Sequence, residues 1–376
     1  MMSRVAPALL SVALLLGLSH CGEEPVDFQD AGGQSCPKVY QVFGTDTAGA
    51  AFNLVFLPDG FMEEELDSYR CAVQTLVDGM MDSGIYKDLA CHINAYRIDL
   101  AADAGEGEVP PAKGCEVNCK PVKAREYPGG NCPGGNPLGT LVSPSGASGC
   151  STASLNVRLC SSPKRCDLVW LDAEGQRSAK CLADCAPAHD AVIIVANSGS
   201  RGGGAMAEND PPLAVVTLFQ IDDPSAIELL AHETAHALFG LLDEYECYYD
   251  GQSYTGGLNA ATAEEKKKRS AFIWARECGE SCPVRCNDPS EMCPDGGVSG
   301  DGLRCCNEEP TDLGDGSLGL IEGAFYHRCG YYRAQNNCRM RTLSKEFCRA
   351  CQMVVEALKK ELSLELCASL PTRRHP

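Results

Sequence analysis

Positive charge is scarce in this chain of 376 residues. Lysine and arginine number 32 against 51 aspartate and glutamate residues, so the formal net charge is −19 and the isoelectric point is about 4.8. A surface this acidic repels a phosphate backbone, which excludes nucleic acid as a partner. The excess of carboxylates favours a soluble protein that works outside the cell, with most of the charge on solvated surface.

Long apolar runs and two common binding motifs are also missing. The N-terminal run from Val5 to Leu18 is too short for a permanent transmembrane helix. The glycine-rich turn at 197–204 lacks the lysine and the spacing of a phosphate loop, so no nucleotide is assigned to it. No segment has EF-hand spacing, which makes structural Ca²⁺ a weaker interpretation than a solvated acidic loop for five aspartates set among glycines: Asp288, Asp295, Asp301, Asp312 and Asp315.

The N-terminus has the form of an export signal. Arg4 precedes the apolar run, which has the length of a signal-peptide core, and residues 1–20 are therefore expected to be a signal peptide. Leu18-Ser-His-Cys21 resembles a bacterial lipobox, although His20 stands where a small residue is usual. Cys21 is thus a candidate for lipidation and membrane attachment, with 21–35 as a tether, and we expect an extracellular or cell-envelope protein.

Cysteine is abundant, with 24 residues. Such a number is typical of a disulfide framework in an oxidising compartment. Without Cys21 the count is 24 − 1 = 23, so a free thiol or an unusual pairing is implied. The pairs Cys115/Cys119 and Cys181/Cys185 have spacings that could suit zinc, but disulfides are favoured. Cys348/Cys351 resembles a redox motif without thioredoxin-like surroundings.

Hydrophobic periodicity predicts an α+β fold with a twisted mixed sheet. We expect strands at 53–57, 93–99, 191–196 and 213–219, another strand near 166–170, and helices at 62–81, 261–277 and the C-terminal end. Residues 101–188 and 246–307 are rich in Gly, Pro and Cys and are interpreted as disulfide-stapled insertions in a single domain at 36–367. The strand at 213–219 is either an ordinary inner strand or one that offers free amides to a peptide.

The segment from 222 to 245 carries the clearest chemistry. Asp222 or Asp223 can act as N-cap before Pro224, and Gly240 follows the last periodic residue, so a helix of about four turns is predicted. The motif His232-Glu233-x-x-His236 lies in its second half and occupies one face. The opposite side is occupied by Ile227, Leu230, Ala231, Thr234, Ala237 and Leu238.

This spacing suits a catalytic metal. Two imidazoles one turn apart can bind one tetrahedral cation, and Glu233 between them points to the open position as a general base. The plainer alternative is two helix histidines that form ordinary hydrogen bonds. A catalytic zinc needs a third protein ligand, for which a thermolysin-like pattern would use Glu264 or Glu265.

The stretch His-Glu-x-x-His-x-x-x-Gly-Leu-x-Asp-Glu-Tyr at 232–245 resembles the bacterial IgA-peptidase family of zinc metallopeptidases. The resemblance covers roughly residues 40–360 discontinuously and departs from the family in the Cys-rich insertions. Further segments recur in the family's order: Leu57-Pro-Asp-Gly-Phe61, Asn94-Ala-Tyr-Arg-Ile-Asp99, Val192-Ile-Ile-Val-Ala-Asn197, Gly319-Leu-Ile-Glu-Gly-Ala-x-Tyr326, Cys338-Arg-Met-Arg341 and Phe347-Cys-x-x-Cys351.

The resemblance implies a metzincin-like zinc endopeptidase that cleaves extracellular proteins or peptides. Compared with metzincins, one residue is added before Gly240, and Asp243 stands in place of the third histidine, with Glu244 as its nearest rival. Met340 is the candidate for the methionine turn beneath the metal. Candidates for a tyrosine near the oxyanion are Tyr326, Tyr331 and Tyr332.

The expected reaction is zinc-assisted peptide hydrolysis in which Glu233 takes a proton from the attacking water and returns it to the leaving amine. A non-catalytic surface protein or adhesin with a structural zinc site is the competing hypothesis, although a structural site does not need a base at Glu233. The substrate itself cannot be read from the sequence.

Overall fold

A computed structural model describes residues 37–44, 51–101, 122–123, 140–143, 168–171, 173–197, 202–218, 224–245, 258–262, 265, 272–278, 282–285 and 316–364. Several sequence predictions lie outside these residues. They are the signal peptide and tether with Cys21, the helix N-cap at Asp222 or Asp223, Glu264, and the five aspartates of the acidic loop.

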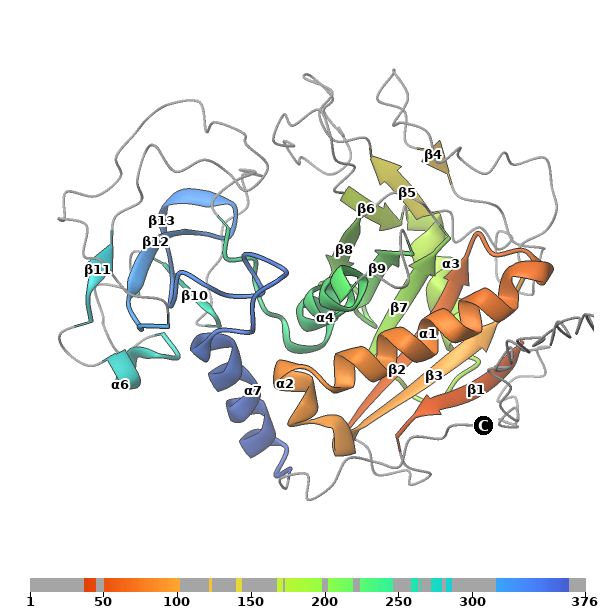
Figure 1. The fold of residues 1–376 in the computed structure, drawn as a ribbon, viewed down its shortest axis with the longest axis horizontal. Helices are drawn as coiled ribbons and strands as arrows, with labels where there is room; N and C mark the ends of the chain where they lie inside the picture. The colour runs from red at the N-terminus through yellow and green to blue at the C-terminus, as the bar shows by residue number, and fades with distance from the viewer. Residues whose placement is uncertain are drawn as a thin grey trace, which may run out of the picture.

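A nine-stranded mixed sheet forms the centre of the molecule, with strand order β1-β3-β2-β7-β9-β8-β6-β5-β4 (Figure 1). The strands β3, β2, β7 and β9 are parallel to one another, whereas β1 and β8 flank them in the antiparallel direction. The bounds are β1 Lys38–Phe43, β2 Phe52–Asp59, β3 Ile93–Asp99, β4 Val122–Lys123, β5 Thr140–Ser143, β6 Leu168–Leu171, β7 Ala191–Ala196, β8 Gly203–Met206 and β9 Leu213–Thr217.

The central strands form where the sequence has short continuous apolar runs. All six residues of β7 are buried, as are seven of the eight in β2, which is expected for strands covered on both faces. Strand β9 ends at Thr217 and is paired on both sides, by β7 and by β8. The hypothesis that this strand offers free amides to a peptide is therefore wrong, and it is an inner strand.

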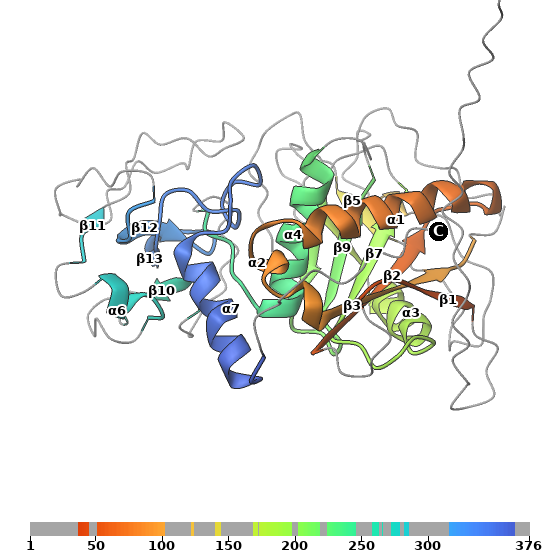
Figure 2. The same cartoon turned by 60° about the horizontal axis from the view of Figure 1, so that its bottom comes forward.

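Helices cover both faces of this sheet (Figures 1 and 2). Helices α1 (Leu66–Met81) and α4 (Pro224–Phe239) share a core with one face, and α3 (Ala173–Ala183) shares a core with the other. Helix α3 lies in a region for which only a strand was predicted. Its buried residues, Ala179, Leu182 and Ala183, are a narrow stripe that the surrounding Gly, Pro and Cys obscure in the sequence.

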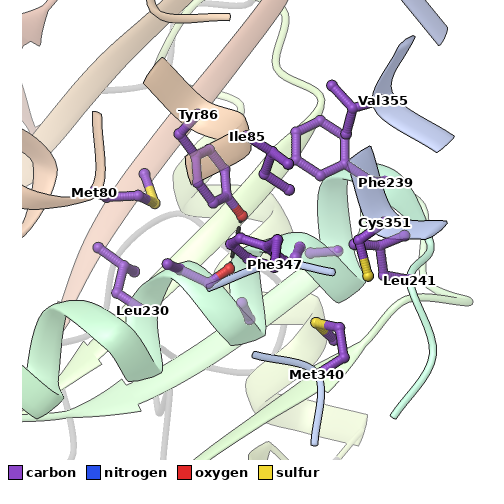
Figure 3. Packing of buried hydrophobic residues seen from close by; sticks show 14 of the residues in the cluster. Met80, Ile85, Tyr86, Leu230, Phe239, Leu241, Met340, Phe347, Cys351 and Val355 are labelled. Carbon is purple, nitrogen blue, oxygen red and sulfur yellow. Dashed lines mark hydrogen bonds between the residues drawn. The ribbon is translucent and has the colours of Figure 1, made fainter. Parts of the chain in front are cut away.

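Short helical turns lie before and after α1, and a longer helix lies near the C-terminal end of the described chain. They are a 3₁₀ turn at Glu63–Glu65, α2 at Gly84–Lys87 and a second 3₁₀ turn at Ala90–His92, and the terminal helix is α7 at Arg349–Glu361. Tyr86 of α2 packs against Phe239 and Phe347, and its hydroxyl donates to the Ala231 carbonyl at 2.8 Å (Figure 3). Tyr86 thus ties α4 to the segment that leads into α7.

A second sheet of four strands lies beyond the C-terminal end of α4 (Figure 1). Its order is β10-β13-β12-β11, with β10 Ala260–Thr262, β11 Val284–Arg285, β12 Leu320–Ala324 and β13 His327–Arg333. The helix predicted at 261–277 is wrong at its start, where the structure has β10, whereas Glu265 and the short helix α6 (Ala275–Cys278) at its end are helical. Pairing of β10 with β13 overrides the helix propensity of its alanines.

No helix among the described residues is both long enough and apolar enough to cross a membrane.

Candidate metal centre

Helix α4 places two imidazoles at one point. His232 and His236 lie one turn apart, with their Nε2 atoms separated by 3.2 Å. Gly240 then adopts a φ of +61°, a left-handed conformation that glycine reaches without strain, and the chain turns back toward the helix. As a result Asp243 Oδ1 lies 3.1 Å from His232 Nε2 and 3.3 Å from His236 Nε2.

Backbone carbonyls orient both histidines. His232 Nδ1 lies 3.1 Å from the Arg339 carbonyl oxygen, and His236 Nδ1 lies 2.5 Å from that of Leu241. A carbonyl accepts but cannot donate, so both Nδ1 atoms carry the proton in these hydrogen bonds. In a neutral imidazole this leaves Nε2 with a lone pair, and the lone pairs of both rings face Asp243.

Two tyrosines hold the Asp243 carboxylate in place. The hydroxyls of Tyr245, at 2.8 Å, and of Tyr326 both donate to Asp243 Oδ2. The other oxygen, Oδ1, is buried and accepts no hydrogen bond from the described residues. The tyrosines thus occupy one side of the carboxylate and turn the second oxygen toward the two imidazoles.

The hairpin between β12 and β13 delivers Tyr326. Phe325 and Tyr326 at its tip have φ values of +48° and +61°, which are uncommon and costly for aromatic residues. Their backbone amides donate to the carbonyls of Asp243 at 2.8 Å and Tyr245 at 3.0 Å. The strained tip is therefore held against the segment that carries the carboxylate.

These contacts leave three atoms with lone pairs pointing at one another, namely Nε2 of His232, Nε2 of His236 and Oδ1 of Asp243. Such an arrangement is unfavourable unless a proton or a metal ion lies among them. Burial disfavours a charged His236, but the nearby Asp243 carboxylate outweighs this effect and raises the pKa of His236 to about 9. Against the opposing effect of burial, the two imidazoles hold the pKa of Asp243 well below its usual range. The donor set could hold a metal ion.

Glu233 lies next to these three atoms and is not one of the residues that supply them. A carboxylate oxygen of Glu233 lies within 4.8 Å of a ring nitrogen of each histidine. Burial raises its pKa above the usual range. Gly203 of β8 packs directly against it, because a Cβ at that position would lie 2.6 Å from Glu233 Oε1. Strand β8 therefore fixes the position of this carboxylate.

The remaining ligand candidates are placed elsewhere. Glu244 turns away from the histidines, and its Oε1 lies 3.2 Å from the Cys348 sulfur. The Glu265 carboxylate accepts a hydrogen bond from the Thr262 amide at 2.7 Å. Of the rivals described, Asp243 is the one that the fold brings to both imidazoles.

Met340, the candidate for the methionine turn, lies in the segment next to the centre. Met340 is fully buried and follows Arg339, whose carbonyl orients His232. Among the three tyrosine candidates, Tyr326 alone is seen to contact Asp243. Tyr331 stacks on His327 with ring centroids 4.4 Å apart, and the Tyr332 hydroxyl lies 3.4 Å from Glu322 Oε1.

Four contributors to the centre were not assigned from the sequence. Tyr245 belongs to the recognised motif, so its position two residues after Asp243 was a usable signal. Gly203 lies within a glycine run that gives no indication of which glycine meets Glu233. The carbonyls of Arg339 and Leu241 have no sequence signature, because every residue carries one.

The chain matches no protein-family model and no curated protein. The relation to IgA peptidases therefore stays a prediction from the motifs quoted above, and the functional argument depends on the geometry of the centre.

Proposed function

We propose that this protein is an exported zinc endopeptidase related to the IgA-peptidase family and metzincin-like in its active site, with His232, His236 and Asp243 as metal ligands. The observation that carries the proposal is the triangle of donor atoms with edges of 3.1, 3.2 and 3.3 Å. Tetrahedral zinc with bonds of about 2.0–2.1 Å separates its ligands by about 3.3 Å. Three protein ligands leave one position for water or substrate, which is typical of a catalytic zinc.

Zinc, when bound, supplies a Lewis acid that acidifies water and polarises a scissile carbonyl. Glu233 takes the proton of the attacking water and returns it to the leaving amine. Its buried, raised-pKa carboxyl suits both transfers, because a base with a pKa closer to neutrality can also act as an acid. The Gly203 backbone holds the carboxyl at this position.

The remaining residues of the centre keep the ligands in place. The Arg339 and Leu241 carbonyls fix the two imidazoles with Nε2 toward the metal position. Tyr245 and Tyr326 hold Asp243 so that a single oxygen faces the metal. The ligand set favours zinc over weaker-binding cations, since two nitrogen ligands and one carboxylate suit a borderline metal.

The test is Glu233→Gln in the full chain, with zinc content by mass spectrometry and hydrolysis of a quenched-fluorescent casein as readouts. We expect undetectable hydrolysis with an unchanged amount of zinc, because the substitution removes the base and keeps the ligands. Substantial turnover by this variant would overturn the proposal. An inactive wild-type protein that retains zinc would instead favour the non-catalytic surface protein.

A further inference from the structure

A second group of metal-ligating side chains lies next to the proposed active site and plays no part in its mechanism. It consists of Glu244, Cys338, Cys348 and Cys351, all buried, with ligand atoms within 4.8 Å of one another. We propose that this cluster, which we call the thiol site, is a structural zinc site with four protein ligands. The proposal is independent of the peptidase activity.

The distances in the thiol site fit one small ion. Cys351 Sγ lies 3.5 Å from the sulfurs of both Cys338 and Cys348, and Glu244 Oε1 lies 3.2 Å and 3.5 Å from the sulfurs of Cys348 and Cys351. Tetrahedral zinc with Zn–S bonds of about 2.3 Å separates two sulfurs by about 3.8 Å and a sulfur from an oxygen by about 3.5 Å. All three cysteines are free thiols.

The buried carboxylate is the second observation that indicates a cation. Glu244 has no exposed surface. Asn259 donates to Oε1 at 2.9 Å, whereas Oε2 is buried and has no hydrogen-bond partner among the described residues. A carboxylate enclosed by three thiols is costly without a counter-ion, and a bound dication removes that cost.

Backbone groups near the sulfurs supply positive partial charge. Cys348 is the N-cap of α7 and Cys351 lies in its first turn, so both residues belong to the positive end of the helix dipole. The Cys348 amide also donates to Cys338 Sγ at 3.3 Å. The spacing Cys-x-x-Cys is common in structural zinc sites, where thiols lose their protons on binding.

The thiol site is placed to support the neighbouring centre. Asp243 and Glu244 are consecutive, and the Glu244 amide donates to the Met340 carbonyl at 2.8 Å. Cys338 begins the turn in which the Arg339 carbonyl orients His232. A metal in the thiol site would thus fix the segment that carries Asp243 and the segment that orients His232, which assigns it a structural role.

The test is metal counting on the full chain. We expect two zinc ions per wild-type chain, one in Cys348→Ser/Cys351→Ser, and two in the matched control Cys278→Ser/Cys282→Ser, which removes a disulfide elsewhere. Because the first variant can fail to fold, a second measurement uses Co²⁺. Cobalt-loaded His232→Ala/His236→Ala should keep a sulfur-to-cobalt charge-transfer band, which histidine and carboxylate ligands cannot produce.

Several outcomes overturn the proposal. They are a disulfide between any two of the three cysteines in a non-reducing peptide map, ready alkylation of all three thiols in the native protein, or absence of the charge-transfer band. A wild-type chain with a single zinc and a strong cobalt–sulfur band would support the thiol site while contradicting the peptidase centre. The two proposals can therefore fail separately.

Discussion

Two consecutive carboxylates, Asp243 and Glu244, serve two different clusters. In an extended segment neighbouring side chains point to opposite sides, so Asp243 meets two imidazoles and Glu244 meets three thiols. The histidine cluster, which consists of His232, His236 and Asp243, has three converging ligand atoms and the base Glu233 beside it. The thiol site has four converging ligand atoms, which leave no coordination position for water or substrate.

This difference separates a reactive centre from a supporting one. An open coordination position and an adjacent carboxyl are what hydrolysis needs, whereas four ligands with three sulfurs suit a metal that never exchanges. The two clusters share a short piece of backbone at Met340, whose carbonyl accepts from Glu244. A substitution in one cluster is thus expected to have a smaller effect on the other cluster.

The largest effect on activity is expected when Asp243 and Glu244 are substituted separately and the two variants are compared. Asp243→Ala should lower peptidase activity at least about a thousandfold, a rise of ~4 kcal/mol in activation free energy, and remove zinc from the histidine cluster alone. Glu244→Gln should lower activity only several-fold and weaken zinc retention in the thiol site. Casein hydrolysis and zinc per chain provide both readouts, and the reverse pattern would make Glu244 the third ligand.

A smaller loss is expected when the tyrosine supports are removed. Tyr245→Phe and Tyr326→Phe each delete one hydrogen bond to Asp243 Oδ2 and should weaken zinc binding by the histidine cluster about 10- to 100-fold. Chelator competition measures this change. Tyr331→Phe is the matched control, since its ring stacks on His327 and should remain there. Equal affinities in all three variants would contradict the supporting role of the tyrosines.

Gly203→Ala should separate the base from the metal ligands. The new Cβ would lie 2.6 Å from Glu233 Oε1, so the carboxyl must move, at a cost of about 1–3 kcal/mol. We expect kcat to fall roughly tenfold or more while the zinc count stays unchanged. Gly79→Ala is the contrast, because its Cβ would meet Ile227 of α4, an apolar contact, and should lower Tm more than kcat. Loss of zinc from the Gly203 variant would count against this role.

The parts of the fold with strong local signals were predicted from the sequence. Helix α4 begins at Pro224 and ends before Gly240 as expected, because proline and glycine fix those two ends physically. Strand β7 also has its predicted bounds, Ala191–Ala196, since six consecutive apolar residues permit little else between polar neighbours. The phase of Gly240 and Asp243 likewise indicated a carboxylate near the histidines.

Contacts between distant segments were not predictable in the same way. The helix expected at 261–277 does not begin at 261, because β10 pairs there with β13, about 70 residues later in the chain. The thiol site was missed for a similar reason. Cys338, Cys348 and Glu244 come together through a turn, a helix N-cap and an extended segment, and no local pattern indicates that these three meet.

The smallest expected effect is on the stability of the metal-free protein, in which a proton on His236 takes the place of the metal. In the metal-free protein the pKa of His236 is raised to about 9, so its pairing with Asp243 stabilises the fold fully below about pH 6.5 and is lost as the pH rises through about 9. With only seven histidines in the chain, selective labelling and NMR titration can follow this group. Asp243→Asn removes the carboxylate charge and should lower the pKa of His236, because only the weaker effects of Glu233 and the Leu241 carbonyl then oppose burial. An unchanged pKa in that variant would mean that another group supplies the charge, and the triangle of donors would lose its electrostatic basis.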